Sequence, residues 1–307
     1  MLVVAANAPD FDVISWFWGR PTWLHWHRNI THSLVGMPIM ALLSVALVAL
    51  VCRKKLNWWQ AFLIALAGVA SHLILDLTNV YGVRLLLPFS GHWTHWDIAP
   101  VVDFAIWGIL LLGVAAPAFS RLVGSEIGEM IPNKGQAGWA VAALLLLTVY
   151  DLARINLHGQ AVAEISAHTY GGSGSARYAP RRVGAFPTAS PLAWRGMAEM
   201  SYGYVDVPVN LLTSFRPADA ATYYKPPRTL GAQAAMATYP FQMLLEFVQY
   251  PLWVIQPALD ADGDTRVSLL DLRFGTPMES GFAATALVDK AGRVRDSVFG
   301  LGEVKAR

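Results

Sequence analysis

Cysteine and charge are both scarce in this chain. Cys52 is the single cysteine among 307 residues, so an internal disulfide and a cysteine-rich zinc site are both excluded. Charged residues make up 14% of the sequence, against roughly 25% in an ordinary soluble domain. Together with a mean hydropathy of +0.41, this deficit predicts a protein whose apolar surface faces lipid. The net charge of +2 is too small to indicate nucleic-acid binding, so no nucleic-acid partner is expected.

Several common sequence signatures are also missing. No nucleophile elbow, Walker loop or dinucleotide fingerprint occurs, which leaves serine-nucleophile chemistry with little support. No internal repeat is present. The apolar run 1–8 is too short for the central region of a signal peptide, and it could be the tail of a longer helix.

What the sequence does contain is a series of apolar stretches in its first half. A membrane span needs about 20 mostly apolar residues, and four stretches approach that length: 34–51, 58–80, 104–119 and 139–155. The last two are slightly short, which suits helices packed against protein. Twelve Trp and ten Tyr fit the aromatic belts at membrane surfaces. Residues 1–155 are therefore predicted to form an α-helical membrane bundle of about four transmembrane helices.

The second half, 156–307, has loops rich in glycine and proline and mixed charges, and it is predicted to be an extramembrane α+β domain. Two strand-like runs, 266–274 and 282–288, are followed by a turn, and 293–299 is expected to pair back as a hairpin. The aromatic-rich stretch 241–254 is interrupted by a proline, so a buried or interfacial helix is expected there rather than a span.

Basic residues set the expected orientation of the spans. The densest positive cluster beside any span is Cys52-Arg53-Lys54-Lys55, and positively charged loops stay in the cytoplasm. The segment before the first span, around His32, then lies on the opposite side, and the second span returns there with His72 and Asp76 in its last third. Two separate polar clusters are thus predicted at the same outer face of the bilayer, where the C-terminal domain also emerges.

Three groups of acids and histidines could hold a metal ion. Asp10 and Asp12 are expected on the same side of an extended segment, where a cation between them would relieve their repulsion. Three of the eight histidines fall within residues 25–32. On a helix, His72 and Asp76 at i and i+4 have Cβ atoms about 5–6 Å apart and can converge on one ion. Ionisable groups inside a span mark function by default.

Each group also has a simpler explanation. The two acids can form a solvated loop end, and a single interfacial histidine can anchor the chain at the membrane surface. His72 and Asp76 can satisfy one another by a hydrogen bond inside the bundle. His95, with His92 in an aromatic-rich loop, could bind substrate or a second metal, or serve as an anchor. Asp103 opens the third span, where a carboxylate favours the helix N-terminus, and a ligand role is the alternative.

Five motifs follow one another in a specific order: Pro9-Asp10-Phe11-Asp12, His27-Arg28-Asn29-Ile30-Thr31-His32-Ser33, His72-Leu73-Ile74-Leu75-Asp76, Tyr81-Gly82 and Pro88-Phe89. In this combination the chain resembles the YdjM family of bacterial inner-membrane, metal-dependent hydrolases, over roughly residues 6–119. Family members usually begin with a further helix that carries a Thr-His pair. No such pair precedes the first motif here, so either the start is truncated or one ligand is lacking.

The resemblance implies a multi-pass protein of the bacterial inner membrane with Asp10, Asp12, His32, His72 and Asp76 as ligands of a divalent metal. Zinc is the expected metal, with manganese or magnesium as alternatives. His27, His95 and Asp103 are possible additional ligands.

As an enzyme, the chain would hydrolyse an ester or phosphoester, and a more distant similarity to zinc-dependent phospholipase C favours the phosphoester. Arg28 would steady the developing anion, and Asp12, if left uncoordinated, would act as general base. The expected partner is a membrane lipid or a lipid-linked small molecule, while the sequence gives no oligomeric state. The alternative is a non-catalytic membrane protein with a structural metal site or a buried His/Asp network.

Overall fold

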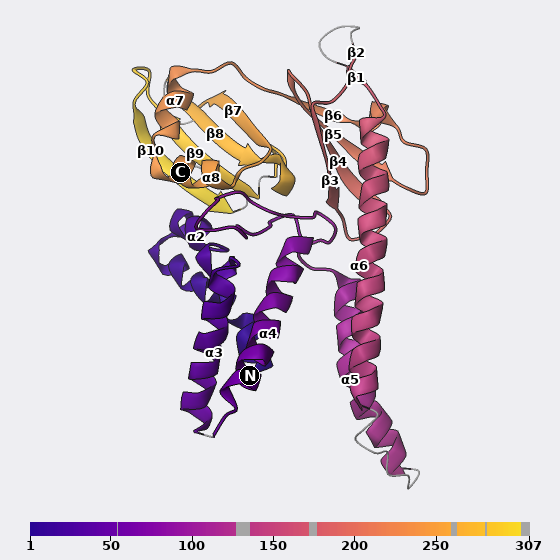
Figure 1. Cartoon of the computed structure of the whole chain (residues 1–307). Helices are drawn as coiled ribbons and strands as arrows, with labels where there is room; N and C mark the ends of the chain where they lie inside the picture. The colour runs from indigo at the N-terminus through magenta and orange to yellow at the C-terminus, as the bar shows by residue number, and fades with distance from the viewer. Residues whose placement is uncertain (54, 127–135, 172–176, 259–262, 280, 302–307) are drawn as a thin grey trace. The chain divides into compact units, whose positions relative to one another are not determined.

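The computed structural model describes residues 1–53, 55–126, 136–171, 177–258, 263–279 and 281–301, so Lys54 of the basic cluster lies outside the described residues. By its internal contacts the chain divides into two compact units. Unit 1 comprises residues 1–77, 81–96 and 223–307, and unit 2 comprises residues 78–80 and 97–222 (Figure 1).

Three helices form the helical part of unit 1: α1 (Leu2–Asn7), α3 (Gly36–Cys52) and α4 (Trp58–Thr78). They pack through small and branched apolar side chains, namely Ala5, Ala8, Met40, Ala41, Val45, Ala61, Ala65, Val69 and Leu73. Gly68 of α4 lies at the close approach, because a Cβ there would stand 3.0 Å from the Leu2 carbonyl oxygen and 3.1 Å from the Ala5 Cβ. The missing side chain therefore lets α1 lie against the middle of α4.

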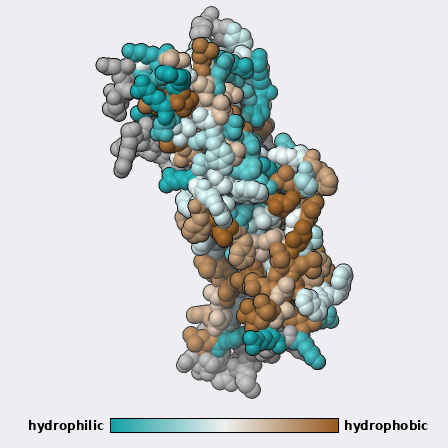
Figure 2. Space-filling view, turned by 90° about the vertical axis from the view of Figure 1, so that its left-hand side faces the viewer, coloured by the Kyte–Doolittle hydropathy of each residue, from teal (hydrophilic) through white to brown (hydrophobic). Residues whose placement is uncertain are grey.

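Other faces of these helices carry large apolar side chains that are exposed. On α3 the exposed set is Ile39, Leu42, Leu43, Leu47, Leu50 and Val51. Figure 2 shows hydrophobic side chains gathered over the helical part, with hydrophilic ones at its lower end. A helix that is apolar on its exposed side is typical of a membrane span.

Short segments connect α1 to α3. They are η1 (Pro9–Trp18), a 3₁₀ helix with Pro9 in its first turn, then α2 (Arg20–Trp26) and η2 (Ile30–His32). The sequence prediction of an extended segment around Asp10 is wrong, because ten residues here follow the 3₁₀ conformation.

The C-terminal part of unit 1 is an antiparallel sheet with the strand order β10-β9-β8-β7. Its strands are β7 (Pro251–Pro257), β8 (Thr265–Asp271), β9 (Phe282–Val288) and β10 (Val294–Leu301). Helices α7 (Leu230–Met236) and α8 (Tyr239–Phe247) and the turn η5 (Leu272–Phe274) complete it. The sheet and α8 pack around one hydrophobic core. Residues from the N-terminal part of the chain also contribute to this core, among them Leu24, Tyr81 and Trp93.

Unit 2 joins two long helices to a second sheet. The helices are α5 (Phe104–Glu126) and α6 (Gln136–Ser166), and the sheet has the order β3-β4-β5-β6. Its strands are β3 (Arg182–Pro187), β4 (Ala193–Glu199), β5 (Gly203–Asn210) and β6 (Ala221–Tyr224). A two-stranded pair, β1 (Tyr170–Gly171) with β2 (Arg177–Tyr178), and the turn η4 (Pro217–Asp219) are added to it. The end of α6 packs on the sheet through Ala161 and Ile165.

The four predicted spans correspond to four helices, and the structure corrects their lengths. Among the described residues, three helices are long and apolar enough to cross a membrane: Trp58–Thr78, Phe104–Leu122 and Ala137–Ser166. Arg20–His32 with Gly36–Cys52, a pair bent by 85°, would make a fourth. The last two spans are longer than their uncharged runs, because a helix continues through polar residues once its backbone hydrogen bonds propagate. The proposed boundary at residue 155 falls inside α6.

The strands predicted near the C-terminus are confirmed as β8, β9 and β10. The single helix expected over 241–254 is wrong. The helix α8 ends at Phe247, and Pro251 begins the edge strand β7. A proline is tolerated there because the first residue of an edge strand need not donate to a neighbouring strand.

Candidate metal centre

His32 lies at the centre of a cluster of acids and histidines in unit 1. Its ring is fully buried, and its two nitrogens face different carboxylates. Nε2 lies 3.5 Å from Asp10 Oδ1, and Nδ1 lies 3.3 Å from Asp12 Oδ2. The 3₁₀ turn of η1 thus places its two acids on opposite sides of one imidazole, an arrangement that an extended segment would not give.

The turn before α3 fixes the position of His32. Asn29 caps η2, since its Oδ1 accepts a hydrogen bond from the Ile30 amide at 2.7 Å. Ser33 Oγ accepts one from the Gly36 amide at 2.9 Å. A Cβ at Gly36 would overlap the Ile30 carbonyl, so only glycine lets the chain turn this tightly into α3. Thr31 Oγ1 donates a hydrogen bond to Asp12 Oδ2 at 3.0 Å.

Helix α4 brings His72 and Asp76 to the same place. His72 Nε2 lies 3.1 Å from His32 Nε2 and 3.3 Å from Asp76 Oδ2, as the i, i+4 spacing predicts. Asp76 Oδ2 also lies 3.4 Å from His32 Nε2. That oxygen is buried, and no hydrogen bond from the described residues reaches it. A buried carboxylate oxygen without a donor is costly, and a cation would satisfy it.

The distances match those of a small tetrahedral ion site. Zinc bonded at about 2.0–2.1 Å to tetrahedral ligands places those ligands roughly 3.3–3.4 Å apart. The two imidazole nitrogens and Asp10 Oδ1 form a triangle with sides of 3.1, 3.5 and 3.6 Å. The same nitrogens with Asp76 Oδ2 form one with sides of 3.1, 3.4 and 3.3 Å. The donor set and its spacing therefore fit a divalent metal, and Asp10, His32 and His72 stand out as one possible ligand group.

A second possible ligand group shares Asp10 with the first. It contains Asp10, Asp12 and His27, whose ligand atoms all lie within 4.8 Å of one another. His27 Nδ1 lies 2.8 Å from Asp12 Oδ1, and its ring stacks on Trp23 at 4.9 Å. Asp10 can thus contribute to either position, and its side chain is 47% exposed, so the cluster is open to solvent on that side.

The surroundings hold the pKa of both acids of η1 well below the usual range of a carboxyl group. Burial by itself would raise the pKa of Asp10, but hydrogen bonds and charge from His32 and His72 outweigh it. At Asp12 burial is likewise outweighed, by His27 and His32. Both side chains are ionised at neutral pH, which is the form that binds metal.

Arg28 contacts the cluster from the protein side. Its Nη2 lies 2.7 Å from Asp76 Oδ1, and its Nη1 donates to the Gly82 carbonyl at 3.2 Å. The guanidinium lies over the Tyr81 ring at 4.6 Å. Arg28 has a φ of +58°, a strained conformation for a non-glycine residue, and its amide donates to Asp12 Oδ2 at 2.9 Å. The Tyr-Gly motif thus has a role that sequence reasoning missed: it supports the arginine that holds Asp76.

Two of the possible additional ligands have other contacts. His95 Nε2 lies 2.7 Å from Gln249 Oε1. Asp103 Oδ1 accepts hydrogen bonds from the Ala105 and Ile106 amides, which is the helix N-terminal role considered for it, and its Oδ2 accepts one from the Tyr150 hydroxyl. Neither belongs to a possible ligand group among the described residues, whereas His27 does.

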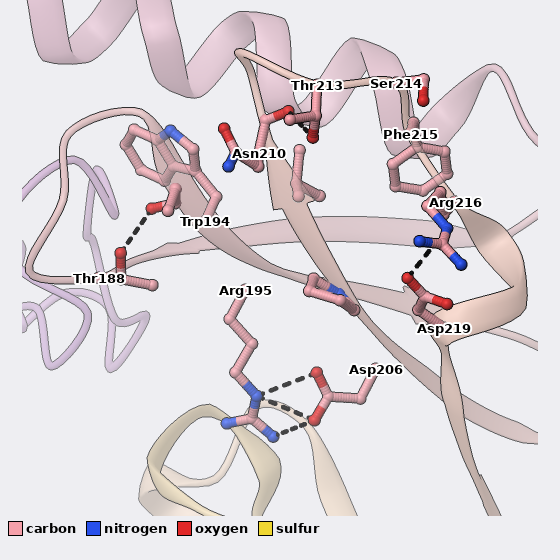
Figure 3. A pocket seen from close by; sticks show the side chains of 13 residues that line it. Thr188, Trp194, Arg195, Asp206, Asn210, Thr213, Ser214, Phe215, Arg216 and Asp219 are labelled. Carbon is pink, nitrogen blue, oxygen red and sulfur yellow. Dashed lines mark hydrogen bonds and ion pairs between the residues drawn. The ribbon is translucent and has the colours of Figure 1, made fainter.

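A hollow of about 470 Å³ lies on the sheet of unit 2, and its charged side chains are paired with one another (Figure 3). Arg195 Nη2 lies 2.6 Å from Asp206 Oδ2, and Arg216 Nε lies 3.3 Å from Asp219 Oδ2. The residues that line it include no histidine or cysteine. Its chemistry is therefore unlike that of the cluster around His32.

A family model and a curated relative match parts of this chain. The model of the family described as YdjM inner membrane protein matches residues 1–160, which include every residue of the cluster. The chain belongs to the YdjM inner membrane protein family. It is also 25% identical over 101 residues to "Uncharacterized protein YfhP" of Bacillus subtilis (strain 168). That match covers 33% of this chain and spans 31% of the relative's length. No solved structure matches the chain.

Proposed function

We propose that this protein is a membrane-bound, metal-dependent hydrolase that acts on an ester or phosphoester. The observation that carries the proposal is the buried Oδ2 atom of Asp76. It accepts no hydrogen bond from the described residues and faces two imidazole nitrogens at 3.3 and 3.4 Å. A divalent ion held there supplies Lewis-acid chemistry, polarising a substrate oxygen and acidifying a water molecule. Zinc suits the two histidines best, with manganese or magnesium as alternatives.

The side chains of the cluster divide into ligands and residues that hold them. His32, His72, Asp10 and Asp76 would bind the ion, and the exposed side of Asp10 leaves room for a substrate. Asp12 holds the far nitrogen of His32, as carboxylates commonly do for metal-bound histidines. Asp12 and His27 would together bind a second ion. If no second ion is bound, Asp12 would accept a proton from the attacking water. Arg28 contacts Asp76 in this structure, so it would position that ligand, and a direct contact with the substrate anion stays a prediction.

The second candidate is a non-catalytic metal site that packs the bundle. It is favoured by the pairing of Arg28 with Asp76 and of His27 with Asp12, because these contacts satisfy several buried groups without any reaction. Structural zinc sites are closed by four protein ligands, whereas catalytic sites keep one position open. The number of protein ligands on the ion thus separates the two candidates. A position of the site on the outer face of the inner membrane is part of the proposal.

The test is metal analysis of the detergent-purified protein with the variants His72→Ala and Asp76→Ala. Both should lose stoichiometric metal and keep their fold by circular dichroism. The matched control is His168→Ala, whose histidine contacts the Glu164 carbonyl in unit 2 and should leave the metal content unchanged.

The same three variants are then assayed with bis(p-nitrophenyl) phosphate and with phospholipid. Hydrolysis by the parent and the control, abolished in the two cluster variants, would support the enzyme. Metal retained at full stoichiometry in both cluster variants would refute the site. Metal bound with no hydrolysis of either substrate would favour the structural alternative.

A further inference from the structure

Helix η1 carries a stripe of large apolar side chains on its outer face. A 3₁₀ helix has 3.0 residues per turn, so side chains at i and i+3 lie directly above one another. Phe11, Ile14 and Phe17 follow this spacing, and they are 63%, 58% and 86% exposed. Runs of 3₁₀ helix longer than three or four residues are uncommon, yet this one extends over 10 residues and keeps the stripe in line.

A neighbouring face of η1, about 120° around the helix from the stripe, belongs to the metal centre. Asp12 and Ser15 lie three residues apart on that face, and Ser15, 5% exposed, donates through Oγ to the Asp12 carbonyl at 2.7 Å. The Asp12 side chain contacts His27 and His32. One short helix thus presents ionised groups to the cluster on one face and aromatic rings to the surroundings on a neighbouring face.

The elements on either side of η1 belong to the apolar helical part of unit 1. Helix α1 precedes it and packs against the middle of α4 through Ala5 and Gly68. On the other side, η2 leads directly into α3, whose first residues continue the exposed apolar surface with Leu34 and Val35. The stripe on η1 is therefore flanked in the sequence by apolar helices of the kind that face lipid in a membrane protein.

The end of η1 has the residue types found at a bilayer surface. Trp16 and Trp18 are exposed there, and the guanidinium of Arg20 lies 5.8 Å from the Trp16 ring. Tryptophan rings concentrate at the level of lipid headgroups, and arginine beside them reaches toward lipid phosphates.

We propose that η1 lies in the membrane–water interface with Phe11, Ile14 and Phe17 inserted among the lipids. The substrate is then a phospholipid of the same membrane, whose phosphodiester reaches Asp10 from the bilayer; this second step rests on the proposed hydrolase function. Interfacial helices bury their apolar face roughly 5–10 Å into the boundary between headgroups and acyl chains. The ion site on the neighbouring face of η1 would accordingly lie at the depth of the lipid phosphates.

The position of η1 is tested without any activity. In a Cys52→Ser background, single cysteines replace Phe17, Leu43 of α3 as the lipid reference, and Leu230 of α7 as the water reference. Each is spin-labelled in vesicles of phosphatidylethanolamine and phosphatidylglycerol, and its collisions with oxygen and with a water-soluble nickel chelate are compared. The label at position 17 should collide more often with oxygen than with the nickel chelate, and the label at position 43 should do the same. A label at 17 as accessible to nickel as that at 230 would overturn the proposal, and so would a label shielded from both reagents, which would indicate a covering protein.

The substrate class is tested with the metal-loaded variant Phe17→Ser. Loss of one buried aromatic side chain should raise KM for vesicle phospholipid about tenfold or more. Its kcat, its metal content and its hydrolysis of bis(p-nitrophenyl) phosphate should not change. Equal loss on both substrates would refute the lipid assignment. If the parent protein hydrolyses neither substrate, the hydrolase function fails while the labelling result still decides where η1 lies.

Discussion

Arg273 and Asp271 form an ion pair in which both side chains are closed to solvent. Arg273 Nη2 lies 2.7 Å from Asp271 Oδ2 and also donates to the Phe247 carbonyl at 3.1 Å. The guanidinium lies 4.9 Å from the ring centres of Phe247 and of Phe274. The pair therefore ties the end of β8 to the end of α8, in the core on which Tyr81 packs.

The variant Arg273→Met removes the charge and keeps an apolar stem of similar length. The carboxylate of Asp271 then stays buried with two weaker hydrogen-bond donors. They are the backbone amide of Gln249 at 3.2 Å and the backbone amide of residue 273 at 3.1 Å. Breaking one side of a buried ion pair costs about 3–5 kcal/mol, whereas replacing both partners by apolar residues is often neutral or stabilising. We therefore expect Arg273→Met to lower the free energy of opening of the C-terminal sheet by about 3–5 kcal/mol, and Asp271→Leu combined with Arg273→Met to recover most of it.

Hydrogen exchange measured by mass spectrometry on peptides from β8 and β9 reports this opening locally, because core strands open near the global free energy. The matched control is Arg293→Met, whose arginine is 80% exposed beside Asp289 and should change the exchange little. The reasoning is refuted if Arg273→Met behaves like the control, or if the double variant is no more stable than the single one.

Three further results are expected. Gly68→Val should separate α1 from α4, since even a Cβ meets backbone atoms at 3.0 and 3.2 Å, and cysteine crosslinking of the two helices should then fail. Thr31→Val removes the hydroxyl that donates to Asp12, so metal affinity in a chelator competition should fall about 10–100-fold with unchanged stoichiometry; a wild-type affinity would contradict this. Chelating the metal should speed hydrogen exchange in η1 and η2 and leave that of α7 unchanged, whereas equal effects on all three would argue against local binding.

Much of the helical part could be predicted from the sequence because its causes are local. Mostly apolar runs predict the N-terminal ends of all four long helices to within a few residues, and the i, i+4 spacing of His72 and Asp76 requires only helical geometry. The basic residues after α3 independently predict that the segment around His32 and the end of α4 lie at the same membrane face, and in the structure the rings of His32 and His72 lie close together.

Other features depend on distant contacts and carry no local signal. Nothing in the composition of 9–18 distinguishes a 3₁₀ helix from an extended segment, because its turns are held by the packing of α2 and by the bonds of Asp12. Likewise, Arg28 has the residue type of a phosphate clamp, but its positive φ directs it to Asp76. The division of the second half between two sheets follows from pairing between strands, which a single sequence does not reveal.

Tyr81 connects the candidate metal centre to a part of the chain outside the family match, which ends at residue 160. One face of its ring supports the guanidinium of Arg28, which holds Asp76, and its other neighbours include Phe247 at 4.7 Å and Phe282 at 5.8 Å. An arginine held over an aromatic ring in a desolvated place gains about 2 kcal/mol, so the ring is part of what fixes the carboxylate. Because α8 and β9 supply the walls around that ring, the C-terminal sheet is a structural component of the centre rather than an independent appendage.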